Sequence, residues 1–170
     1  MNVSLSTFAI FGAEYLYFVL ILIAVIQFFL LIKSKRQQVA MLAITTLPIS
    51  FIILKIAGAL YNNPRPFVTD GVIPLIAHKV NNGFPSDHTI LCAVIASLIF
   101  SVHKKTGIIL WILTLLVGAS RVYVGVHHPV DVVTSMLIAV VVAYACSIVN
   151  PKLLKFTWYV KIQELVKKYV

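Results

Sequence analysis

Residues 120–131 read SRVYVGVHHPVD and join two strongly apolar segments of the chain. Pro129 fits the first turn of a helix, so this stretch predicts a short turn between two helices. Charged and imidazole side chains are costly among apolar helices, and where they occur there they usually mark a function. The stretch therefore predicts both a helical bundle and the position of a functional site within it.

The composition is that of an integral membrane protein. Of the 170 residues, 61% are hydrophobic and 11% are charged, whereas soluble domains average roughly 45–50% apolar and 25% charged residues. The length allows one domain, residues 1–170, so any site has to be built between membrane helices. The net charge is +9, but the basic residues cluster beside apolar segments, a pattern that favours a membrane surface over nucleic acid.

The apolar pattern predicts an all-α, polytopic membrane helical bundle with about five transmembrane helices. Five segments are long enough, or nearly so, for a hydrocarbon core of roughly 30 Å. They lie at residues 14–32, 39–60, 88–102, 107–124 and 129–149. Short amphipathic segments are expected at both ends: residues 1–13 form an interfacial helix or stay unanchored, and residues 150–170 form a cytoplasmic amphipathic tail.

The basic residues also predict the orientation in a plasma membrane. Ten of the 14 lysines and arginines follow the first, third or fifth segment. The positive-inside rule makes that side cytoplasmic and places the C-terminus there. The loop at residues 61–87 and the turn at 125–128 then share the extracytoplasmic face, where we expect the site.

Two clusters in that loop carry residues suited to binding phosphate. Arg65 lies between Pro64 and Pro66, which hold it in a stiff, extended segment that favours bidentate contact with an oxyanion. Ser86 is expected to cap a helix whose free N–H groups make a phosphate site. His88, in the first turn of that helix, is placed to act as a general acid.

The turn at residues 120–131 adds a cation and a histidine–carboxylate pair. Arg121 is expected to bind an oxyanion, with snorkelling or pairing with Asp131 as the alternatives. Asp131 either stabilises the start of its helix or folds back to orient a histidine ring, as a carboxylate does for a catalytic base or nucleophile. The convergence of three clusters on one face favours the second role.

Two charged residues keep open interpretations. Lys55 lies inside an apolar segment, where it either reaches the same anion or snorkels. Glu14 begins the first segment, where it either favours the helix N-terminus or contacts the site from across the bundle. His78 and His103 are interpreted as loop or interfacial residues.

These clusters resemble the motifs of the type 2 phosphatidic acid phosphatase superfamily, Lys-x6-Arg-Pro, Pro-Ser-Gly-His and Ser-Arg-x5-His-x3-Asp. The third motif matches fully, from Ser120 to Asp131, and the second matches at residues 85–88 with Asp87 in the glycine place. The first departs, because Gly58 stands where the family has lysine and Lys55 is the nearest one. The resemblance covers residues 50–149, and the Asp87 form is similar to the bacitracin-resistance branch, which dephosphorylates undecaprenyl pyrophosphate.

The resemblance implies a role for each matching residue. His127 would be the nucleophile that takes the phosphoryl group, Asp131 its partner, and His88 the acid that protonates the leaving group. The phosphate oxygens would be held by Arg65, Arg121, Ser86, Asp87 and Lys55. His128 is not the nucleophile, because only His127 stands at the family's interval from Arg121 and Asp131.

The expected function is removal of the terminal phosphate from a lipid pyrophosphate such as undecaprenyl pyrophosphate, through a phosphohistidine. Only five acidic residues occur, without a metal-binding pattern, so no metal or other cofactor is expected. One alternative is the same chemistry on phosphatidylglycerophosphate or phosphatidic acid. An alternative of another class is a transporter or binder that only holds a lipid phosphate, but such a protein needs no nucleophile, acid and orienting carboxylate.

Overall fold

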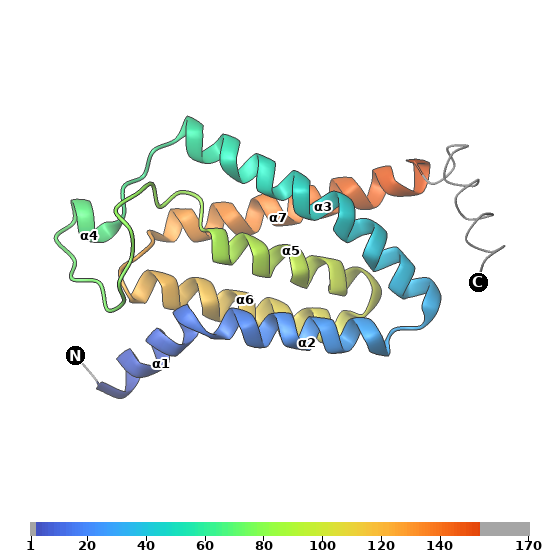
Figure 1. Cartoon of the computed structure of the whole chain (residues 1–170), viewed down its shortest axis with the longest axis horizontal. Helices are drawn as coiled ribbons and strands as arrows, with labels where there is room; N and C mark the ends of the chain where they lie inside the picture. The colour runs from blue at the N-terminus through green and yellow to red at the C-terminus, as the bar shows by residue number, and fades with distance from the viewer. Residues whose placement is uncertain (1–2, 154–170) are drawn as a thin grey trace.

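The computed structural model describes residues 3–153 as a bundle of helices with one long loop. The helices are α1 (Val3–Glu14), α2 (Leu16–Leu30), α3 (Lys33–Leu60), α4 (Pro66–Thr69), α5 (Asp87–Val102), α6 (Lys104–Tyr123) and α7 (Pro129–Leu153). Figure 1 shows α5 at the centre, with α3 and α7 on one side and α2 and α6 on the other. The predicted tail, residues 150–170, falls largely outside the described residues.

The helix bounds confirm most of the predicted segments and correct one. α5, α6 and α7 begin within three residues of the predicted starts, whereas α3 begins at Lys33, six residues earlier than expected. The charged and glutamine residues after Lys33 are good helix formers, so the helix continues past its apolar part. α1 is anchored to the bundle, because Ala9, Gly12 and Ala13 are buried and Gly12 packs against Ser120 of α6. The unanchored alternative is therefore wrong.

Fewer helices than predicted are long enough to cross a membrane. Among the described residues, α3, α6 and α7 are long and apolar enough to cross a membrane, and α1 with α2, bent by 50°, makes up to four. α5 has 16 residues and falls short of the roughly 20 that a span needs. A bundle of membrane-type helices is confirmed, but the count of about five is not.

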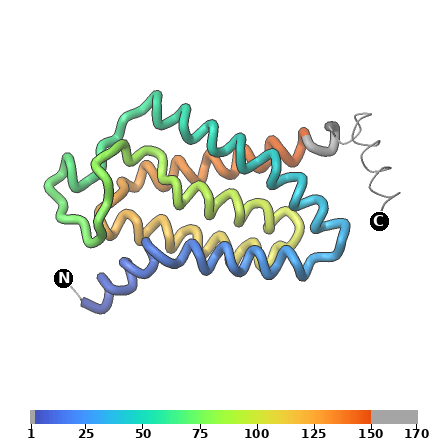
Figure 2. The backbone as a smooth tube through the Cα atoms, viewed as in Figure 1, coloured from blue at the N-terminus to red at the C-terminus, as the bar shows by residue number. Residues whose placement is uncertain are grey.

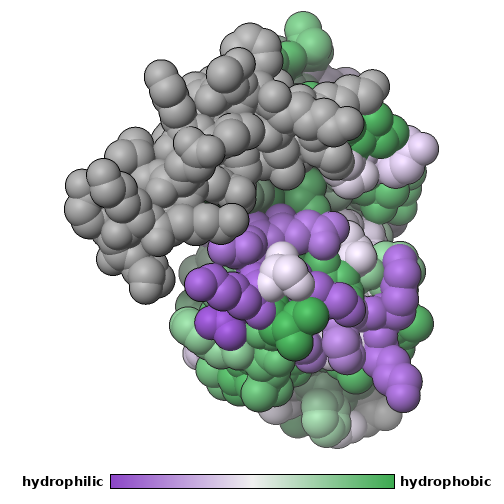
Figure 3. All heavy atoms as spheres, turned by 90° about the vertical axis from the view of Figure 1, so that its right-hand side faces the viewer, coloured by the Kyte–Doolittle hydropathy of each residue, from purple (hydrophilic) through white to green (hydrophobic). Residues whose placement is uncertain are grey.

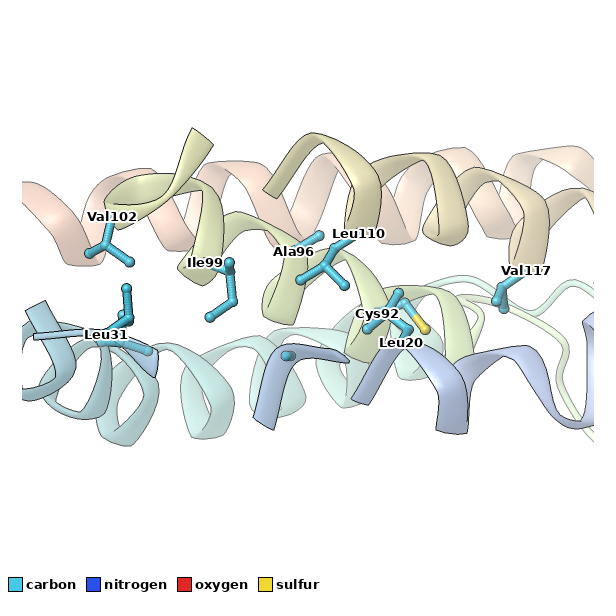
Figure 4. Close-up of a cluster of buried hydrophobic side chains, with 10 residues drawn as sticks. Leu20, Leu31, Cys92, Ala96, Ile99, Val102, Leu110 and Val117 are labelled. Atoms are coloured by element: carbon cyan, nitrogen blue, oxygen red, sulfur yellow. The ribbon is translucent and has the colours of Figure 1, made fainter. Parts of the chain in front are cut away.

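α5 forms the core because small residues let its neighbours approach closely. Cys92, Ala93 and Ala96 are fully buried. On one side α5 packs against α2 and α6 through a cluster that includes Leu20 and Leu110 (Figure 4). On the other side it packs against α3 and α7 through a second cluster. The start of α5 is thereby fixed relative to all the long helices.

The two ends of the bundle differ in character. The loop with α4, the start of α5 and the α6–α7 turn lie together at one end (Figure 2). The opposite end carries the α2–α3 and α5–α6 turns, and Figure 3 shows hydrophilic side chains gathered there. The exposed basic residues of these turns are Lys33, Lys35, Lys104 and Lys105. The predicted separation of the polar clusters from these basic turns is confirmed.

Candidate active site

A sharp turn between α6 and α7 delivers His127 into the bundle. Gly125 adopts a φ of +78°, a conformation that suits glycine, and a Cβ there would meet Val72 at 2.8 Å. Val124 and Val126, on either side, are fully buried beside Ala13 of α1. The turn is thus pinned by apolar contacts, and the His127 that follows it is only 2% exposed.

His127 lies against Asp131, one turn into α7. Nδ1 of His127 is 3.3 Å from Oδ2 of Asp131, and both side chains are buried. The same carboxylate accepts hydrogen bonds from the His128 backbone N–H at 2.9 Å and from the Asn63 amide at 2.7 Å. Asp131 therefore stabilises the start of α7 and also orients an imidazole, so the two roles left open by the sequence coexist.

Arg65 approaches the other nitrogen of the same ring. Its Nη1 is 3.3 Å from Nε2 of His127 and donates to the Val126 carbonyl at 2.6 Å, while its Nε donates to Asn81 at 2.8 Å. A guanidinium has donors only, so Nε2 of His127 offers its lone pair to Arg65. The partners of the ring assign the proton to Nδ1, facing Asp131, and leave the lone pair on Nε2.

Burial also sets the charge state of this ring. Burial lowers the pKa of His127 below its ordinary value of 6.5. The hydrogen bond with Asp131 raises the pKa, and the neighbouring cations Arg121 and Arg65 lower it. The net lowering of the pKa of His127 favours neutral imidazole, the form that carries a free lone pair.

Arg121 lies in the last turn of α6, inside the bundle. It is 3% exposed, so the snorkelling alternative is wrong, and among the described residues it forms no ion pair with Asp131. Its Nη1 donates to the Ala13 carbonyl at 3.4 Å, and its Nη2 lies 3.0 Å from Nε2 of His78. Its Nε is buried without a hydrogen-bond partner in the described part of the chain. A buried, unpaired cationic donor is costly, and an anion would satisfy it.

The start of α5 brings Ser86 and His88 to the same end of the bundle. Ser86 precedes the helix as predicted, but its side chain makes no capping bond. Its hydroxyl instead accepts from Thr89 at 3.0 Å, and its carbonyl accepts from Ser135 of α7 at 3.1 Å. His88 packs edge-on against the Tyr17 ring at 4.9 Å between centroids.

A cavity of about 370 Å³ joins several of these groups. Its lining includes Glu14, Tyr17, His78, His88 and Arg121. The centroid of the His127 ring lies 6.3 Å from that of the His78 ring. The structure thus brings cationic and imidazole groups from α5, α6 and the α4–α5 loop around one space, next to His127. Glu14 reaches this space from across the bundle, as one of its two interpretations proposed.

Lys55 and Asp87 lie apart from this cavity. Both line an apolar groove of about 280 Å³ between α3 and α5, and Nζ of Lys55 is 5.0 Å from the centre of the Phe51 ring. Both residues are exposed. The structure does not bring Lys55 to the other site residues, whereas Asp87 lies close enough to Arg65, His88 and Arg121 to act on them electrostatically. The assignment of Lys55 and Asp87 to phosphate binding stays a prediction.

The structure adds three residues that the sequence interpretation missed. Asn63 holds Asp131, Asn81 holds Arg65, and His78 contacts Arg121. The only available signal was their position in the loop that carries Arg65 and Ser86. His103, in contrast, caps α6 at the opposite end by accepting from the Thr106 N–H. Within residues 3–153, no group of three His, Cys, Asp or Glu side chains is arranged to hold a metal ion.

Comparison with known proteins gives the same class of chemistry. The model of the PAP2 superfamily matches residues 39–155. The bacitracin transport permease protein BcrC of Bacillus licheniformis is 40% identical over 84% of this chain and 70% of its own. The undecaprenyl-diphosphatase BcrC of Bacillus subtilis is 34% identical over 84% and 74%. The crystal structure of Aquifex aeolicus LpxE has a TM-score of 0.60 at 26% identity, covering 85% of this chain and 83% of that one.

The chain belongs to the PAP2 superfamily. It is a phosphatase and a membrane protein, since its helices are apolar and long and its relatives are membrane phosphatases. The resemblance seen in the three motifs is thereby confirmed.

Proposed function

We propose that this chain hydrolyses the terminal phosphate of a polyprenyl pyrophosphate and converts undecaprenyl pyrophosphate into undecaprenyl phosphate. The observation that carries the proposal is the arrangement at His127, whose ring is held by Asp131 at Nδ1 and faces Arg65 at Nε2. The substrate class rests on similarity to a relative named undecaprenyl-diphosphatase.

In the first step, Nε2 of His127 attacks the terminal phosphorus. A P–N bond forms, the anhydride P–O bond breaks, and the bridging oxygen leaves on undecaprenyl phosphate with a proton from His88. Asp131 stabilises the positive charge that develops on the ring. Arg65 and Arg121 neutralise the equatorial oxygens, which is most of what phosphoryl transfer requires of a protein.

In the second step, water attacks the phosphohistidine. His88 takes the proton of that water, the P–N bond breaks, and inorganic phosphate leaves with the His127 ring restored. Arginine cations supply the charge neutralisation that Mg²⁺ supplies in kinases, which supports a reaction without a metal. Ser86, Asp87 and Lys55 remain assigned to the phosphate by the family resemblance alone, Lys55 only as the lysine nearest to the motif position.

The lipid and the orientation have separate support. The groove between α3 and α5 is lined by Asp87 and by mostly apolar side chains, so it offers a surface for a lipid tail. The exposed lysines at the opposite end of the bundle favour a cytoplasmic position for that end. We place the site on the extracytoplasmic face of the plasma membrane, with the C-terminus inside.

Phosphate release from three lipids tests the substrate. The purified chain, in detergent with EDTA, is given undecaprenyl pyrophosphate, phosphatidylglycerophosphate and phosphatidic acid in parallel. We expect release with EDTA present and a preference for the polyprenyl substrate. A glycerolipid preference would overturn the substrate and keep the mechanism, whereas lipid binding without release would favour the binder or transporter.

The pH profile tests the charge state of His127. Attack needs the neutral ring, and the pKa of His127 lies below 6.5. Protonation of His127 should therefore lower kcat/KM only below pH 6.5, whereas protonation of His88, the acid of the first step, should raise it as the pH falls. The measurement is kcat/KM from pH 4.5 to 8, with the ionisation of the substrate phosphate determined separately and divided out. A half-loss of kcat/KM at or above pH 6.5 would contradict this assignment.

A further inference from the structure

His78 lies in the loop between α4 and α5, outside the three motifs, yet it contacts the buried cation of the third motif. Its Nε2 is 3.0 Å from Nη2 of Arg121, and its ring lines the same cavity as His88. Arg121 can only donate, so Nε2 of His78 accepts. The second contact of the ring, Nδ1 to the Lys79 carbonyl at 3.4 Å, fits the same tautomer, with the proton on Nδ1.

The contact is between a cation and neutral acceptors, which matters for an anion site. Arg121 is held by the His78 ring and by the Ala13 carbonyl. A carboxylate in either place would hold the guanidinium but cancel much of its charge. Neutral acceptors fix the direction of the guanidinium and leave its positive charge for a phosphate. The Nε of Arg121, which has no partner among the described residues, is likewise left for a phosphate.

The surroundings of His78 keep it in the acceptor form. Burial is the main cause that lowers the pKa of His78 to about 4, with further lowering by Arg65, Arg121 and His127 and an opposing effect of the Lys79 carbonyl. Glu14, which lines the same cavity, is the carboxylate on the α1 side. At neutral pH the ring is therefore uncharged.

The loop holds His78 firmly from both sides. On the N-terminal side, Ile76 is buried against Val124 and Val126, and the Leu75 N–H donates to the Val124 carbonyl at 3.0 Å. On the C-terminal side, Asn81 accepts from Nε of Arg65 at 2.8 Å. The imidazole is thus mounted between the α6–α7 turn and Arg65, which is the rigidity that a supporting residue needs.

We propose that His78 is a positioning residue of the phosphatase reaction, which fixes the Arg121 guanidinium at the cavity wall by accepting a hydrogen bond from its Nη2. The inference rests on the proposed function and adds to it a residue that the three motifs do not contain. His78 acts through Arg121 and not on the substrate itself.

The test is a double-mutant cycle on the purified full-length chain. His78→Phe keeps a planar ring without an acceptor, whereas His78→Gln can present an oxygen near the position of Nε2. Each is made alone and with Arg121→Ala, and kcat/KM for undecaprenyl pyrophosphate is measured with thermal denaturation in parallel. His103→Phe, the same change at the opposite end of the bundle, is the matched control.

We expect His78→Phe to lower kcat/KM roughly tenfold to hundredfold, the effect of losing a hydrogen bond to a charged group. His78→Gln should recover most of the loss, and His78→Phe should add little once Arg121 is alanine. A glutamine variant as poor as phenylalanine, or a full additional loss in the alanine background, would overturn the inference. So would unchanged turnover in His78→Phe, with the proposed function left intact, whereas no turnover by the wild type would refute both.

Discussion

Replacement of His127 by glutamine should reduce phosphate release by at least about ten-thousandfold, the scale of loss when a catalytic nucleophile is removed. Glutamine fills similar space and can still hydrogen-bond to Asp131 and Arg65, but it has no nitrogen that can form the P–N bond. His127 is 2% exposed, whereas the ring of the neighbouring His128 lies against Asn63 and Asp70.

The matched control is His128→Gln. His128 pairs with Asp70 at 3.2 Å, and the two side chains are 23% and 51% exposed, so this contact is worth little. We expect kcat/KM within about fivefold of the wild type. A rapid-quench experiment with substrate labelled at the terminal phosphate should trap label on the wild-type and His128→Gln chains only. Label on the His127→Gln chain would remove His127 from the nucleophile role.

Asp131→Asn should lower kcat by roughly a thousandfold to ten-thousandfold, the range seen when a carboxylate that orients a catalytic histidine becomes an amide. The Asp131 carboxylate accepts from His127, the His128 N–H and Asn63. An amide offers one oxygen for these three donors and turns its own N–H toward at least one of them. The His127 ring is then free to hold its proton on Nε2, where it cannot attack.

Asp70→Asn is the corresponding control, because Asp70 faces the other histidine of the pair at the surface. It should keep kcat within about fivefold. Thermal denaturation separates the catalytic effect of Asp131→Asn from its effect on the start of α7. Near-wild-type turnover by an Asp131→Asn chain would show that the carboxylate does not orient the nucleophile.

The helices were predictable because their signal is local. The long apolar runs predicted the positions of α5, α6 and α7, and only the start of α3 was misplaced, since helix propensity continues past the apolar stretch. The break between α1 and α2 lies where the sequence separated residues 1–13 from the first apolar segment. The bend of 50° between the two helices was not predicted, because apolar composition does not specify an angle.

The site was predictable where its members are close in sequence. His127 and Asp131 are four residues apart, so a turn that leads into a helix brings them together whatever the rest of the chain does. The placement of Arg65 against His127 was expected only as convergence on one face, and the structure supplies the contact through Nε2. The position of Lys55 could not be predicted in this way, because it depends on which face of α3 carries it. In the structure that face lines the apolar groove.

The sequence by itself determined a membrane helical bundle and the motifs of a phosphatase, and it predicted His127 in preference to His128 as the nucleophile. Apolar runs, prolines and short intervals act within a few residues, and this is why they can be read from the chain. Only the tertiary structure decided that Asn63 holds Asp131 and that His78 holds Arg121. Those contacts span 68 and 43 residues, and they depend on the path of a loop whose course is set by packing against the α6–α7 turn.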